Sequence, residues 1–205
     1  EKPEKRLLTS LKESGIDGCA LTISQERDLQ KSQDAVNDLP PFPVGIWLRY
    51  ETSEKGASPN GPWDFLILSA SSSPSSLLAD EGCKKVLQVA PSMEEGAIRA
   101  IEHLPVDAVL LDDGKEQSQN IYWLLTLYRF TQLVRKPLLA KIPATTSQKE
   151  LQSLRDSGIA GIVVEVSDQV GVDLLKGMRQ MLEALPPRQK REERGEAIIP
   201  RIPTI

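Results

Sequence analysis

The sequence has little of the chemistry from which many enzyme sites are built. It contains one histidine, His103, so sites that need several histidines, including most zinc centres, are excluded. A Ser-His-Asp triad would depend on that one residue. The two cysteines, Cys19 and Cys83, cannot form a disulfide framework or a cysteine-rich metal knuckle. We therefore expect no metal site of these types.

An excess of positive charge and long apolar runs are also lacking. Lys and Arg number 25 against 29 Asp and Glu, a formal net charge of −4, which argues against a nucleic-acid partner because few cations remain to neutralise phosphates. No window approaches 18 uncharged apolar residues, so no membrane span is expected. A sequence with only two cysteines and no recognisable signal peptide favours a cytoplasmic location.

What is present fits one globular domain with a tail. The chain has 205 residues, of which 40% are hydrophobic, enough for a single buried core. We expect a domain over 1–187. Residues 188–205 follow as a tail that is first charged (RQKREERGE) and then apolar.

The apolar pattern predicts an α/β fold. Short continuous apolar runs, rather than alternating ones, indicate strands buried on both faces, hence a parallel sheet covered by helices. Between them lie segments with helical periodicity. The predicted strands are 18–24, 44–50, 64–69, 85–90, 108–113, 137–142 and 161–166. The predicted helices are 4–14, 25–38, 74–81, 92–104, 118–135, 147–157 and 171–185.

An internal repeat indicates a (β/α) barrel. Residues 11–24 (LKESGIDGCALTIS) match 154–167 (LRDSGIAGIVVEVS) as a helix end, a glycine stop and a buried strand. An open doubly wound sheet is the alternative. Seven strands are recognisable, and an eighth either precedes Glu1, comes from 197–199, or is absent.

The segment KPLLAKIP with ELQSLRDSGIAGIVVEV resembles flavin- and phosphate-binding TIM barrels, over about a quarter of the chain. The resemblance implies a TIM-barrel-like fold. It also implies glycine-rich turns that hold phosphate after the last strands. The residues there are 167–171 (SDQVG), without a glycine pair, so the sequence leaves any cofactor unknown.

Polar residues near the ends of the predicted strands form one candidate site. They are Thr22, Arg49, Ser69, Gln88, Asp112, Lys141 and Glu165. A charge on the outer face would be buried against apolar helices without a partner, which is costly, so we expect these side chains to point into the barrel mouth. Barrel active sites are assembled at that end.

This set allows two interpretations. Arg49 and Lys141 balance Asp112 and Glu165, so the four could form a structural ionic layer. Alternatively they bind a small anionic ligand, with Arg49, Gln88, Ser69 and Thr22 as ligand-binding residues. An acidic pair at 112–113 before Gly114 could hold Mg²⁺, but Asp-Gly is also common turn chemistry, and we predict no metal.

A catalytic version of the site depends on Lys141. Its type and location are similar to those of the nucleophile of Schiff-base aldolases, which implies a lysine-dependent aldolase or lyase. Glu165 or Asp112 would then be the acid/base and Arg49 the substrate anchor. A flavin-dependent oxidoreductase is a third possibility.

The helix predicted over 118–135 is apolar on more than one face. An outer barrel helix needs a single apolar stripe, so the surplus predicts a covering partner. We expect a homodimer through this helix or through the tail. The sequence therefore favours a degenerate barrel that acts as a small-ligand-binding or homo-oligomeric assembly module, with the lyase as the alternative.

Overall fold

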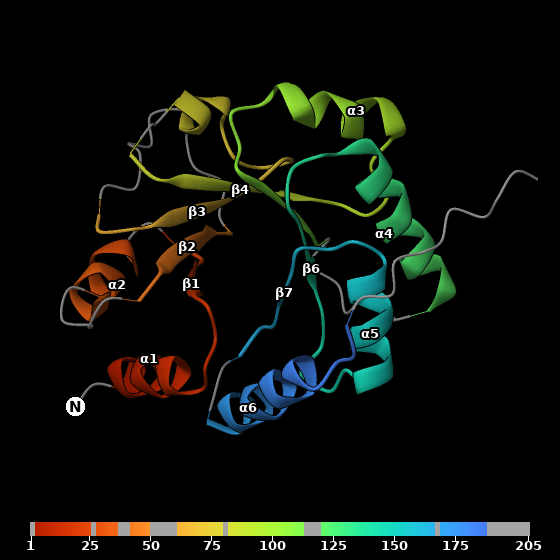
Figure 1. Cartoon of the computed structure of the whole chain (residues 1–205). Helices are drawn as coiled ribbons and strands as arrows, with labels where there is room; N and C mark the ends of the chain where they lie inside the picture. The colour runs from red at the N-terminus through yellow and green to blue at the C-terminus, as the bar shows by residue number, and fades with distance from the viewer. Residues whose placement is uncertain are drawn as a thin grey trace, which may run out of the picture.

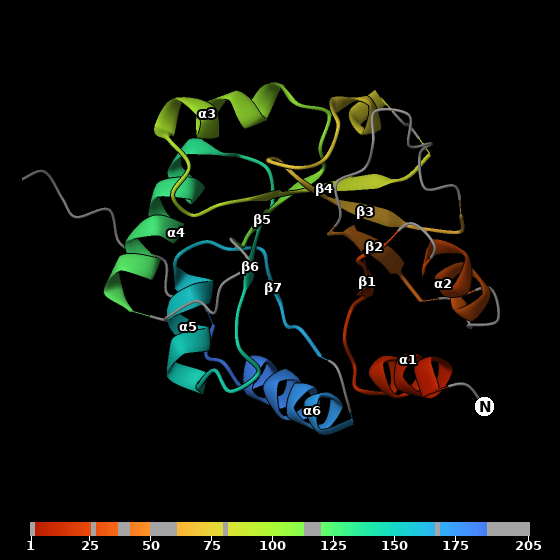
Figure 2. The same ribbon diagram turned by 180° about the vertical axis from the view of Figure 1, so that it is seen from behind.

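The computed structural model describes residues 3–25, 28–36, 42–49, 61–79, 82–112, 120–166 and 169–187. Seven strands form one parallel sheet in the order β1-β2-β3-β4-β5-β6-β7. They are β1 (Cys19–Ile23), β2 (Val44–Leu48), β3 (Phe65–Ser69), β4 (Lys84–Val89), β5 (Ala108–Leu111), β6 (Leu138–Lys141) and β7 (Gly161–Val163). The sheet curls, and helices lie on its outer side (Figures 1 and 2).

The helices alternate with the strands. They are α1 (Pro3–Glu13), α2 (Asp28–Val36), α3 (Glu95–Ala100), α4 (Ile121–Leu133), α5 (Gln148–Asp156) and α6 (Gln169–Glu183). Two short 3₁₀ helices are η1 (Ser75–Ala79) and η2 (Ile101–His103). The predicted parallel α/β architecture is thus confirmed. The helix predicted over 92–104 is divided into α3 and η2, and the one predicted over 74–81 is only a 3₁₀ helix.

The sequence repeat has a structural basis in two matching helix ends. Ser14 and Ser157 are both buried, and each hydroxyl donates to a helix carbonyl, of Leu11 and Leu154 respectively, at 2.6 Å. The glycine that follows each serine has a positive φ, 80° at Gly15 and 98° at Gly158. Glycine adopts this conformation without a steric penalty, so both helices stop there and the chain turns into β1 and β7.

The two faces of the sheet have different packing. The outer face meets the helices through two apolar clusters, one of which includes Phe130 of α4 and the other Ile46 of β2. The inner face carries its own cluster, centred on Trp47, Ile67, Val86 and Leu110. The inner side of the barrel is therefore a packed core.

Gly45 of β2 makes room for that inner core. A Cβ built on Gly45 would lie 2.4 Å from the Phe65 ring and 2.6 Å from the Phe65 carbonyl oxygen. Real Cβ atoms do not approach other atoms so closely. The glycine therefore allows Phe65 of β3 to lie across β2.

The sheet has two edges, β1 and β7. Helices α1 and α6 come together below them in the view of Figure 1. Arg179 of α6 there forms an ion pair with Asp17, 3.3 Å away. The tail segment 197–199, one of the predicted sources of an eighth strand, lies outside the described residues. Among the described helices, none is both long and apolar enough to cross a membrane.

Candidate functional site

Five of the seven predicted site residues come together at the carboxyl ends of the strands. Each lies two positions after a residue of the inner core, and side chains two apart on a strand share a face. Gln88 and Lys141 belong to β4 and β6, whereas the other three follow the last residue of β2, β5 or β7. The five are Arg49, Gln88, Asp112, Lys141 and Glu165, and we call them the mouth cluster.

Asp112 is the buried centre of the mouth cluster. Its side chain is 0% exposed, and both cations face it, with Nη2 of Arg49 and Nζ of Lys141 each 3.7 Å from a carboxylate oxygen. The amide of Gln88 donates to the carboxylate at 3.1 Å and to the backbone carbonyl of the same residue at 3.3 Å. A buried carboxylate needs such partners to stay charged, so Asp112 is a fixed part of the site.

Glu165 is the exposed counterpart of Asp112. Its carboxylate lies 2.8 Å from Nζ of Lys141 and 3.6 Å from Nη2 of Arg49, while 53% of its side chain is exposed. The hydrogen bond from Lys141, with the charges of Lys141 and Arg49, lowers the pKa of Glu165 below that of an ordinary glutamate. Glu165 is therefore ionised at neutral pH, and the contacts it makes with described residues hold it from the side of the two cations.

Trp47 supports the cluster, and the sequence analysis did not single it out. Its indole Nε1 donates to Oε1 of Gln88 at 3.0 Å, which orients the Gln88 amide toward Asp112. The guanidinium of Arg49 lies over the Trp47 ring, 4.2 Å from its centroid, a cation–π distance. The sequence signal that could have identified Trp47 is its position two residues before Arg49, since side chains two apart along a strand share a face.

Thr22 and Ser69 are not part of these contacts. Thr22 pairs in register with Trp47 and is exposed near the open edge of the sheet. Ser69 pairs in register with Gln88, but its hydroxyl lies 3.0 Å from the hydroxyl of Ser71 in the following turn. Their predicted role as ligand-binding residues stays a prediction.

Other reactive residues lie away from the cluster. His103 is exposed at the end of η2, as expected from its place in the sequence. Burial raises the pKa of the Cys19 thiol to about 11, which disfavours the reactive thiolate. Within the described parts of the chain, no group of three metal-ligating side chains forms, and the second carboxylate of the 112–113 pair lies outside them.

The geometry suits recognition of a polar ligand. Two cations share two carboxylates, so the cluster is neutral, yet three of its four ion pairs are 3.6–3.7 Å long. Charge-assisted hydrogen bonds are about 2.7–2.9 Å long. Arg49 and Lys141 could therefore donate shorter hydrogen bonds to an additional anion. Water reaches the two cations on the side of Glu165, whose side chain is half exposed.

Comparison with known proteins identifies the fold. No protein-family model and no curated protein sequence matches the chain. A mutant tryptophan synthase alpha-subunit from Pyrococcus furiosus is similar in structure, with a TM-score of 0.63 and 14% identity over 88% of this chain and 91% of that one. Thiamine phosphate pyrophosphorylase from P. furiosus gives 0.64 and 13%, over 89% and 90%. The N-acetylmannosamine-6-phosphate 2-epimerase of Clostridium perfringens gives 0.51 and 14%, over 78% and 77%. The chain therefore has the TIM-barrel-like fold that its sequence predicts.

Proposed function

We propose that the chain binds a small anionic molecule at the mouth cluster. The observation that carries this proposal is the combination of long ion pairs and solvent access. A structural ionic layer is expected to be closed and closely bonded, because each buried charge needs its partners. Here the side chains of Arg49 and Glu165 are 28% and 53% exposed.

Binding would exchange one carboxylate for another anion. Asp112 is buried among Arg49, Lys141 and Gln88 and stays in place. Glu165 reaches the same cations from the solvent side, so an incoming phosphate or carboxylate would take its position and release it to water. An incoming carboxylate would leave the charge of the cluster unchanged, and a phosphate monoester would add up to one negative charge. In both cases Arg49 and Lys141 keep an anionic partner, which avoids leaving an unpaired buried charge.

A phosphate ester is the ligand class we favour. Two of the structurally similar proteins are named for phosphorylated compounds, thiamine phosphate and N-acetylmannosamine-6-phosphate. Active sites of TIM barrels lie at the carboxyl ends of the strands, where the mouth cluster lies. Arg49 can bind two phosphate oxygens at once through its planar guanidinium, and Lys141 adds a point charge.

Titration with glycerol 3-phosphate tests this proposal. The indole N–H of Trp47, assigned by its loss in Trp47→Phe, reports on the site because it lies between Gln88 and Arg49. We expect a saturable shift of this NMR signal. Arg49→Gln and Lys141→Gln should each weaken binding about tenfold or more, the loss of one charge-assisted hydrogen bond.

Lys84→Gln is the matched control. Lys84 pairs with Asp107 at 3.0 Å, but it begins β4 and so lies at the opposite end of the barrel. Its variant should bind as the wild type does. The absence of a saturable shift with glycerol 3-phosphate and with inorganic phosphate would overturn the proposal and leave the cluster a structural ionic layer.

A lysine-dependent aldolase or lyase is the second candidate. Lys141 is only 15% exposed and lies beside two carboxylates that could move protons. Its amine would attack a carbonyl carbon, form a C–N bond and release the oxygen as water. The 2.8 Å contact with Glu165 is typical of a charged ammonium, however, whereas this attack requires a neutral amine. For this reason we place binding first.

Reductive trapping separates the two candidates. Borohydride reduces an iminium to a stable secondary amine, so incubation with glyceraldehyde 3-phosphate and borohydride would add the sugar mass, less the oxygen lost as water, at Lys141. A lysine nucleophile requires this adduct in the wild type and its loss in Lys141→Gln. A flavin oxidoreductase, the third possibility, requires the purified protein to absorb as oxidised flavin does.

A further inference from the structure

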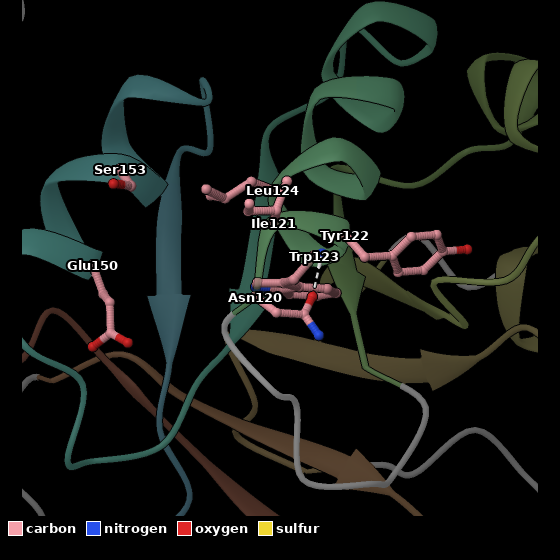
Figure 3. A pocket seen from close by; sticks show the side chains of 7 residues that line it. All are labelled: Asn120, Ile121, Tyr122, Trp123, Leu124, Glu150 and Ser153. Carbon is pink, nitrogen blue, oxygen red and sulfur yellow. Dashed lines mark hydrogen bonds between the residues drawn. The ribbon is translucent and has the colours of Figure 1, made fainter.

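A groove lies on the outer surface, between the start of α4 and α5. Its volume is about 510 Å³, and mostly apolar side chains line it on the α4 side, while Glu150 and Ser153 face them from α5 (Figure 3). The lining residues are Asn120, Ile121, Tyr122, Trp123, Leu124, Glu150 and Ser153. The groove is separate from the mouth cluster, which lies on the inner face of the sheet.

The exposed surface of α4 beside the groove is unusually apolar. Ile121, Tyr122 and Leu125 of α4 are 76%, 72% and 60% exposed. A helix on the outside of a barrel normally turns polar side chains to water, because exposed apolar area is costly. This cluster of large apolar side chains indicates a covering partner.

Trp123 lines the groove and has a buried hydrogen-bond donor. Its side chain is buried, with 3% exposed, and among the described residues no acceptor lies within reach of its indole Nε1. An unsatisfied buried donor costs about 1–3 kcal/mol. The oxygen of the Asn120 side chain already accepts from the backbone N–H of Trp123. An occupant with a free carbonyl oxygen would satisfy the indole.

We propose that residues 199–205 of this same chain (IPRIPTI) dock in the groove as an extended segment. Pro200 and Pro203 form a P-x-x-P pattern, which favours the polyproline II conformation, and grooves lined by aromatic side chains bind such segments. The backbone carbonyls of this conformation have no internal partners, so one of them can accept from Trp123.

The charges of the two partners are complementary. Arg201 lies between the two prolines, and Glu150 lies at the α5 side of the groove. Hydrogen bonds from Ser147 lower the pKa of Glu150, so its carboxylate is charged at neutral pH. Arg201 and Glu150 can therefore pair while the isoleucines contact Ile121 and Leu124.

The chain can reach the groove without a second copy. Arg155, in the last turn of α5, donates to the backbone carbonyl of Pro186, so the chain leaves the described structure beside that end of α5. The helix has nine residues and is about 14 Å long. The chain from 187 to 199 can span roughly 40 Å. Because the segment is tethered, its effective concentration at the groove is high.

Hydrogen–deuterium exchange of the full chain tests the proposal. Amides of the 199–205 segment should exchange about tenfold or more slowly than in a free peptide of the same sequence. Ile121→Asp, which places a charge on the exposed rim, should restore fast exchange in the segment. Leu174→Asp is the matched control, since Leu174 is also an exposed apolar residue, 42% exposed, but lies on α6.

The outcomes separate the possible occupants. Exchange of the segment as fast as in the free peptide overturns the proposal, and so does protection that both aspartate variants leave unchanged. Protection that appears only as the concentration rises, together with a native mass of twice 22.6 kDa, would place the segment on a second copy and overturn docking within one chain. Loss of protection in Ile121→Asp alone, at a monomeric mass, supports it.

Discussion

Nζ of Lys141, at the end of β6, lies 2.8 Å from the carboxylate of Glu165, which follows β7. Asp112 faces the same ammonium from the buried side at 3.7 Å. Of the two carboxylates, the exposed one therefore has the closer contact and the buried one the longer contact. This arrangement makes Glu165 the group that an incoming anion can displace, and it leads to the first two predictions.

Glu165→Gln should bind glycerol 3-phosphate more tightly than the wild type, by a factor of about 1.4 to 5. An ion pair as exposed as this one contributes about 0.2–1 kcal/mol. The ligand has to displace this ion pair in the wild type, and the substitution removes it. The Trp47 indole signal provides the affinity. Glu183→Gln is the control, because its ion pair with Arg179 is also 2.8 Å long, with 63% of the Glu183 side chain exposed, at the far end of α6. Weaker binding in Glu165→Gln would show that Glu165 holds the ligand instead.

The stability that Glu165 contributes should depend on pH. Its pKa is lower in the folded protein than the ordinary value, so the folded state binds its proton less readily than the unfolded state does. Its contribution is therefore fully present above the ordinary glutamate range and is lost as the pH falls through the folded pKa. Thermal unfolding of wild type and Glu165→Gln should differ near pH 7 and converge in acid. A difference that grows toward low pH would contradict this.

Asp112→Asn should destabilise the fold by about 2 kcal/mol. The substitution keeps the shape but removes the only fully buried charge of the mouth cluster, which leaves Arg49 and Lys141 facing a neutral amide. Urea unfolding measures the loss. Asp173→Asn, whose side chain is 67% exposed and 3.9 Å from Lys176, should change stability by less than about 0.5 kcal/mol. Equal effects at both positions would argue against a buried anchor.

Gly45→Ala should destabilise the barrel by about 1–3 kcal/mol, the usual range for overpacking. The added Cβ meets both the ring and the backbone of Phe65, and a backbone atom cannot move aside as a flexible side chain can. Gly96→Ala in α3 is the control, since a Cβ there meets nothing within 4 Å. Alanine also has a higher helix propensity than glycine, so the stability of Gly96→Ala should be unchanged or slightly higher.

Much of the fold could be predicted from the order of residues alone. The continuous apolar runs predicted all seven strands, because strands buried on both faces need apolar side chains at every position. The repeat predicted the turns at Gly15 and Gly158, since only glycine adopts a positive φ there at no cost. The cost of burying a charge against the outer helices also predicted that Arg49, Gln88 and Lys141 point inward.

Contacts between strands were decided by tertiary structure. The sequence predicted one set of seven polar residues at the barrel mouth, with Thr22 and Ser69 among its ligand-binding residues. Strand register, however, placed Thr22 at an exposed edge and left the Ser69 hydroxyl beside Ser71. It also brought Trp47 against Gln88, which lies 41 positions further along the chain. Local patterns determine which face a side chain occupies, whereas its distance from other strands follows from the curl and register of the whole sheet.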